Sequence, residues 1–64
     1  PTLRVFDISG NDIRNVGSFP LLLNMLNIQD NPNIYITVPE LILYRMITGS
    51  FLLLFDEDQH VEGI

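Results

Sequence analysis

The chain has 64 residues, of which 47% are hydrophobic, and three Arg against eight acidic residues give a formal net charge of −5. This composition is typical of a chain that folds, although a domain of this size buries only about 60% of the surface that its unfolded chain exposes. Cysteine is absent, which excludes disulfides and thiolate metal sites. The absence of cysteine is compatible with the cytoplasm but does not identify the compartment.

The charge is unevenly distributed, because four of the eight acidic residues follow Phe55, where no Lys or Arg occurs. A nucleic-acid partner would require a basic stripe to neutralise phosphates, and the sequence has none. No apolar run approaches the roughly 20 residues that span a bilayer, and no signal-peptide pattern is present. We therefore expect neither nucleic-acid binding nor membrane association.

An internal repeat organises most of the chain, since Pro1, Pro20 and Pro39 are evenly spaced and each opens an apolar string. Apolar residues at alternate positions in each string predict a short strand that alternates between interior and surface. These inward pairs are Phe6/Ile8, Leu26/Ile28 and Tyr44/Met46. The predicted units are repeats at residues 1–19, 20–38 and 39–51, followed by a C-terminal strand and acidic cap at 52–64.

Asn11 and Asn31 follow the first two strands, where the chain must turn. A buried backbone group without a partner costs about 1–3 kcal/mol, and an amide side chain can both donate to and accept from such groups. We predict that the two side chains form a structural ladder inside the turns. The alternative is that they are ordinary turn asparagines.

These residues together resemble the leucine-rich repeat, whose signature is L-x-x-L-x-L-x-x-N-x-L. The matching positions are Leu3, Phe6, Ile8, Asn11 and Ile13, then Leu23, Leu26, Ile28 and Asn31, and more loosely Leu41, Tyr44, Met46 and Phe51 with Gly49 in place of the Asn. The resemblance implies an α/β-type solenoid that is mostly β, with short parallel strands and little helix. It also implies a protein-binding module that uses its concave strand face.

Two return segments lie between the strands. Ile13, Val16 and Phe19 recur at every third position, which suits a loose 3₁₀-like or extended path. Residues 33–38 alternate apolar and polar side chains, so we expect an extended segment on the convex side.

Residues 39–48 admit a second interpretation, a C-terminal capping helix after two repeats. Pro39 suits the first helical position, Glu40 the N-terminus, Arg45 the later turns, and Gly49 the position after the end. Such a helix is apolar on nearly all sides and would require full burial, which a small chain hardly provides. We therefore favour the strand that the repeat alignment predicts. Beyond it, we expect a strand at 52–55, a turn at 56–59, and a short strand or frayed end at 60–64.

One cluster contains residue types used in catalysis or metal binding: Asp56, Glu57, Asp58, His60 and Glu62. Its spacing does not fit an EF-hand loop, and no nucleophile is arranged with the single His. We interpret the cluster as a solvated acidic turn. We expect no enzymatic activity, no cofactor and no metal site.

Strand residues between the inward ones are predicted to form the partner-binding face. The expected rows are Val5, Met25 and Leu43, then Asp7, Asn27 and Arg45, then Ser9, Gln29 and Ile47. An apolar row beside a polar row suits the binding of a protein partner, with Met as an adaptable contact. The alternative function is a structural or assembly element. Its open edge strand, near residues 3–8, would pair with another chain, including a second copy, or with upstream repeats.

Overall fold

The computed structural model describes residues 4–19 and 22–63, so Pro1, Leu3 and Pro20 of the repeat pattern lie outside the described residues. Within these ranges the chain forms mostly strands and one helix, in the order β1 (Val5–Asp7), β2 (Met25–Asn27), β3 (Tyr35–Thr37), α1 (Glu40–Thr48), β4 (Leu52–Leu54) and β5 (His60–Glu62). No helix among them is long and apolar enough to cross a membrane.

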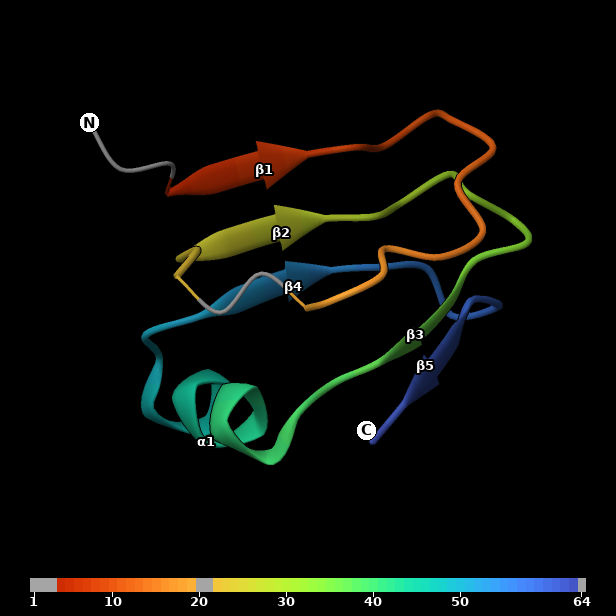
Figure 1. The fold of residues 1–64 in the computed structure, drawn as a ribbon. Helices are drawn as coiled ribbons and strands as arrows, with labels where there is room; N and C mark the ends of the chain where they lie inside the picture. Colours follow the sequence, from red (N-terminus) through yellow and green to blue (C-terminus); the bar gives the residue numbers. More distant parts are fainter. Residues whose placement is uncertain (1–3, 20–21, 64) are drawn as a thin grey trace.

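Two small parallel sheets organise these strands. In the first sheet, β2 lies between β1 and β4, with Phe6 opposite Leu26 and Leu26 opposite Leu53. In the second sheet, β3 pairs with β5. Figure 1 shows β1, β2 and β4 stacked one above another, and β3 beside β5. The expectation of short parallel strands is confirmed.

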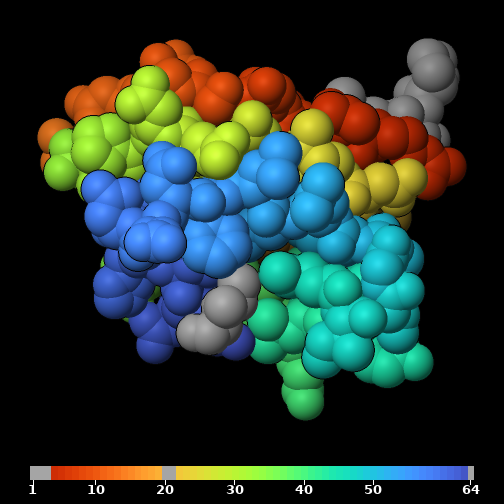
Figure 2. Space-filling model, turned by 180° about the vertical axis from the view of Figure 1, so that it is seen from behind, coloured from red at the N-terminus to blue at the C-terminus, as the bar shows by residue number. Residues whose placement is uncertain are grey.

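We refer to the successive passes of the chain as layers. The first layer is β1 with the residues up to 19, the second is residues 22–51, and the third is residues 52–63. Seen from behind in Figure 2, the layers form bands that run from red and orange through yellow to blue, with α1 in teal below them. The sequence separation from Phe6 to Leu26 is shorter than that from Leu26 to Leu53, because α1 lengthens the second layer.

The core forms from the inward residues of both sheets and of α1. Leu26, Ile28 and Ile42 are completely buried. Strand β3 contributes through the alternation of its segment, since Ile34, Ile36 and Val38 are buried while the residues between them are exposed. Residues Tyr35–Thr37 of the segment 33–38 form a strand, as the alternation predicts. Of the two expectations for the end of the chain, the short strand is confirmed at His60–Glu62, which is β5. The core residues are Leu23, Leu26, Ile28, Ile34, Ile36, Val38, Ile42, Phe51 and Leu53.

The predicted strand around Tyr44 and Met46 is wrong, because residues Glu40–Thr48 form helix α1. The helix lies where the second interpretation expects it, with one difference at its start. Pro39, expected at the first helical position, is the N-cap with φ −64° and ψ 153°, and Gly49 ends the helix in the left-handed region with φ 84°. Glu40 lies in the first turn, where a negative charge complements the helix dipole.

The objection that such a helix must be buried on all sides also fails. Of the helix, only Ile42 is buried, while Leu41, Tyr44 and Ile47 are 58%, 64% and 85% exposed. The helix needs only a narrow contact with the core. It is not a terminal cap, because the chain continues into β4, which extends the sheet beside β2. The expected strand at 52–55 is thus confirmed as β4, and it supplies the third strand of the sheet in place of residues 39–51.

Candidate functional site

The outward side of the three-stranded sheet carries an apolar row. Val5 lies opposite Met25, and Met25 lies opposite Leu52, in the parallel register of β1, β2 and β4. Val5 is 53% exposed, Leu52 is 55% exposed and Met25 is half-buried. The row crosses every strand of this sheet, and its end members offer apolar surface to the solvent.

A second row, Asp7, Asn27 and Leu54, borders the first and is polar in the first two layers. Asp7 Oδ1 accepts hydrogen bonds from the backbone N–H of Ser9 at 2.9 Å and from its hydroxyl at 2.6 Å. Asn27 Oδ1 accepts one from the backbone N–H of Gln29 at 3.0 Å. These bonds hold the start of each turn in the same way, which fixes Ser9 and Gln29 beside the row.

The carboxylate of Asp7 is the fixed negative charge at this border. The hydroxyl and N–H of Ser9 and the side chain of Asn27 stabilise its ionised form, so they lower the pKa of Asp7 below the ordinary value of 3.8. Asp7 therefore remains charged near neutral pH. The face offers apolar contact beside a negative charge.

Leu43 and Arg45 do not lie on this face, which corrects the prediction that they continue the two rows. Both belong to α1, where Leu43 packs half-buried against the core. Arg45 Nη2 donates to the backbone O of Leu23 at 2.9 Å, and the guanidinium lies 5.4 Å from the centre of the Phe51 ring. Arg45 therefore joins the helix to the start of the second layer. Ile47 is likewise on α1, where it is exposed.

Leu52 and Leu54 occupy the register positions beside Met25 and Asn27 that were predicted for Leu43 and Arg45. Sequence reasoning identified this segment as a strand but did not assign it to the sheet. The signal that could have found it is the apolar run itself, which continues without a polar residue from Phe51 to Phe55.

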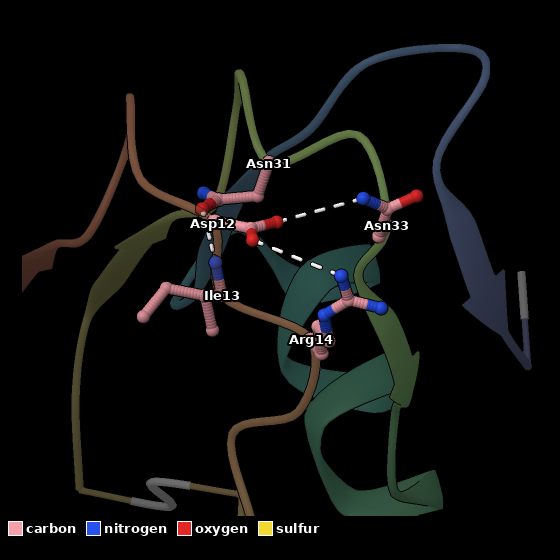
Figure 3. A network of polar contacts seen from close by, with 5 residues as sticks. All are labelled: Asp12, Ile13, Arg14, Asn31 and Asn33. Atoms are coloured by element: carbon pink, nitrogen blue, oxygen red, sulfur yellow. Dashed lines mark hydrogen bonds and ion pairs between the residues drawn. The ribbon is translucent and has the colours of Figure 1, made fainter.

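Asn31 lies completely buried in the turn after β2. Its Oδ1 accepts from the N–H of Ile13 at 3.0 Å, and its Nδ2 donates to the carbonyls of Ile8, Ile28 and Gln29 at 3.0, 2.9 and 3.2 Å. Figure 3 shows the side chain directed at the backbone of Ile13. One side chain thus satisfies backbone groups of two layers.

Asn11 occupies the corresponding turn of the first layer and is exposed. Its Nδ2 donates to the carbonyls of Ile8 and Ser9, both at 3.0 Å. In the third layer, Gln59 is buried and donates from Nε2 to the carbonyls of Ile28 at 2.6 Å and Asn31 at 3.2 Å. Sequence reasoning missed Gln59, because the repeat signature has an Asn at this place and the spacing after the strand differs.

Further polar contacts join the first two layers near Asn31. The Asp12 carboxylate lies between Asn33 Nδ2, at 3.5 Å, and Arg14 Nη2, at 3.8 Å (Figure 3). The Arg14–Asp12 pair is about 70% exposed on both sides, and exposed pairs contribute at most about 1 kcal/mol. This network supports the packing of the first two layers.

The acidic tail separates into two parts. Asp56 accepts from the backbone N–H of Asp30 at 2.8 Å, so it helps to hold the turn of the second layer. His60 stacks on Tyr35 with ring centroids 4.2 Å apart, and Glu62 Oε2 lies 2.9 Å from His60 Nε2 and 3.1 Å from the Tyr35 hydroxyl. Residues 4–19 and 22–63 contain no group of three or more His, Asp or Glu side chains that could hold a metal ion.

Comparison with protein-family models, with curated proteins and with solved structures finds no match for this chain. The likeness to leucine-rich repeats therefore rests on the residue pattern alone.

Proposed function

We propose that the chain is a protein-interaction module of the leucine-rich-repeat type, which binds a partner through the outward face of β1, β2 and β4. The observation that carries the proposal is the row of Val5, Met25 and Leu52, which lies in register across three strands and exposes both end residues. Apolar side chains gathered in this way contribute binding free energy when a partner removes them from water.

The chemistry of the face selects the kind of partner. The carboxylate of Asp7 borders the apolar row, and the whole chain carries a net charge of −5. A segment with apolar side chains flanked by Lys or Arg complements both features. We assign this face no catalytic residue, cofactor or metal.

A selection of random peptides displayed on phage provides the test. Peptides that bind the wild-type chain are expected to be enriched in apolar residues flanked by basic ones. Chemical-shift changes on binding are expected at Val5, Met25 and Leu52. The substitution Leu52→Asp should weaken binding at least tenfold, about 1.4 kcal/mol, since it places a desolvated charge in the apolar row.

Ile47→Asp is the matched control, because Ile47 is an exposed apolar residue that lies on α1 rather than on the strand face. It should change the affinity less than twofold. Shift changes that gather on Leu41, Tyr44 and Ile47, or equal losses in both variants, would contradict the proposal. A selection that enriches no peptide would count against it as well.

A further inference from the structure

The three inward strand positions that face one another differ sharply in exposure. Phe6 is 41% exposed, whereas Leu26 is 0% and Leu53 is 6% exposed. Strands β1 and β4 are both at the edges of their sheet, so position at an edge does not explain the difference. The inward residue at the β4 edge is buried, whereas the one at the β1 edge keeps a large part of its side chain exposed.

The amide side chains repeat this asymmetry. Asn31 reaches into the first layer through Ile8 and Ile13, and Gln59 reaches into the second layer through Ile28 and Asn31. Each therefore bonds to the layer before its own. Asn11 makes the same bonds to its own turn that Asn31 makes, but within residues 4–19 and 22–63 there is no layer before it.

The backbone hydrogen-bonding groups of β1 show the same asymmetry between its two sides. Arg4 O and Ile8 N form hydrogen bonds with the second layer. In β2, the N–H of Met25 and the C=O of Asn27 face back toward β1. Val5 and Asp7 are the register partners of those two residues, so their N–H and C=O groups face the open side of the sheet.

We propose that the open side of the first layer is a docking surface for one further layer of the same construction. Its strand would run parallel to β1 and cover Phe6, and its turn would present a carbonyl and an N–H to the Asn11 amide. The proposal extends the interface that already joins the first two layers. Pairing of β1 with β1 of a second copy fits less well, because a two-fold axis makes that pairing antiparallel and brings no turn to Asn11.

A tandem extension tests this inference without relying on the proposed partner-binding face, because its readout is stability. A copy of residues 1–20 is placed ahead of the full chain, so that the copied Phe6 precedes the original Phe6 by the same interval that separates Phe6 from its register partner Leu26. The extended chain is expected to unfold at higher urea concentration. Asn11→Ala, at the original Asn, should lower the folding equilibrium constant at least tenfold in the extended chain and less than threefold in the original chain.

Asn33→Ala is the control, because Asn33 is exposed and lies in the second layer; its effect should be the same in both chains. A synthetic peptide of residues 1–20 added to the labelled original chain gives a second reading that does not depend on folding of the extended chain. It should shift the backbone amide resonances of Val5 and Asp7 and the side-chain amide of Asn11, but not the resonances of Leu52, which lies on the proposed partner-binding face at the far strand β4.

Three results would overturn the inference. The first is an Asn11→Ala effect of equal size in both chains. The second is the failure of the extended chain to fold, combined with a peptide that shifts none of these resonances. The third is a dimer of the original chain, seen by light scattering, that Phe6→Asp converts to a monomer, which would assign the edge to another copy of the same chain.

Discussion

Asn31 joins two layers through a single buried amide that both donates and accepts. Its donors reach the carbonyls of Ile8 and Ile28, and its oxygen receives the N–H of Ile13. A carboxylate of the same shape can accept but cannot donate. The amide chemistry, and not only the size of the side chain, is therefore required at this position.

We predict that Asn31→Asp and Asn31→Ala each lower the free energy of unfolding by about 3 kcal/mol or more, because several buried backbone groups lose their partners at about 1–3 kcal/mol each. Urea unfolding followed by circular dichroism measures the loss. Asn11→Ala is the control in the same chain and should cost less than about 1 kcal/mol, since Asn11 is exposed. Similar losses in all three variants would show that the burial of Asn31 is unimportant.

The turns that follow β1 and β2 also share a backbone conformation. Gly10 has φ 71°, and Asp30, at the corresponding place in the second layer, has φ 59°. Asp is one of the few residues with a side chain that tolerates this left-handed region, so both turns use the same backbone conformation with different residues.

Most strands could be predicted from the sequence, whereas helix α1 is not the interpretation that the repeat spacing favours. The strands around Phe6 and Leu26, the extended segment of β3, and the strand after Phe51 follow from alternation and apolarity. The repeat spacing predicts a strand at residues 39–51, whereas Pro39 and Gly49 mark the ends of a helix there. The helix can form without full burial because Leu41, Tyr44 and Ile47 stay exposed, and the periodicity of the sequence does not reveal that exposure.

The register of the strands follows the predicted rows only where the repeat is regular. The register places Val5 beside Met25 and Asp7 beside Asn27, as the spacing indicates. Leu52 could not be assigned to the apolar row, because the helix shifts the third strand along the chain. The pairing of β3 with β5 could not be deduced either, since short exposed strands carry little information about their partners.

Gly49 gives a direct test of the helix ending. A Cβ at this position would meet nothing within 4 Å, so substitution costs only the backbone strain of φ 84°. We predict that Gly49→Ala lowers the free energy of unfolding by about 1 kcal/mol, while Gly49→Asn loses less than half as much because Asn tolerates this conformation. Thermal melts of both variants measure the difference. Equal losses would argue against a left-handed helix end.

At the scale of the whole molecule, the second sheet ties the tail to the middle of the chain. Glu62 on β5 receives hydrogen bonds from His60 and from the Tyr35 hydroxyl on β3. These contacts lower the pKa of Glu62 below its ordinary 4.5, and the bond to Glu62 raises the pKa of Tyr35 above 10.0. Both shifts favour the ionised carboxylate beside the neutral phenol.

Stability is therefore expected to fall at acid pH. A lowered carboxyl pKa contributes stability that is present above pH 4.5 and is lost as the pH falls through the folded-state pKa. The raised Tyr35 pKa acts at the alkaline end, where its contribution is lost as the pH rises past 10.0.

Urea midpoints at pH 6 and pH 3 should differ less in Glu62→Gln than in the wild type. Part of the fall should remain in that variant, because Asp7 shifts in the same direction. An unchanged difference would show that Glu62 makes no such contribution.

The pairing of β3 with β5 has a consequence for how the chain acquires its structure. Tyr35 and His60 are register partners although all of α1 and β4 lies between them along the chain. During synthesis, the first two strands can meet and the N–H of Tyr35 can reach the carbonyl of Arg14, but the edge of β3 that faces β5 stays unpaired until residues 60–62 leave the ribosome. Closing so long a loop slows folding. Slowed translation between β3 and β5 would therefore prolong the interval in which a chaperone or a protease finds an exposed strand edge.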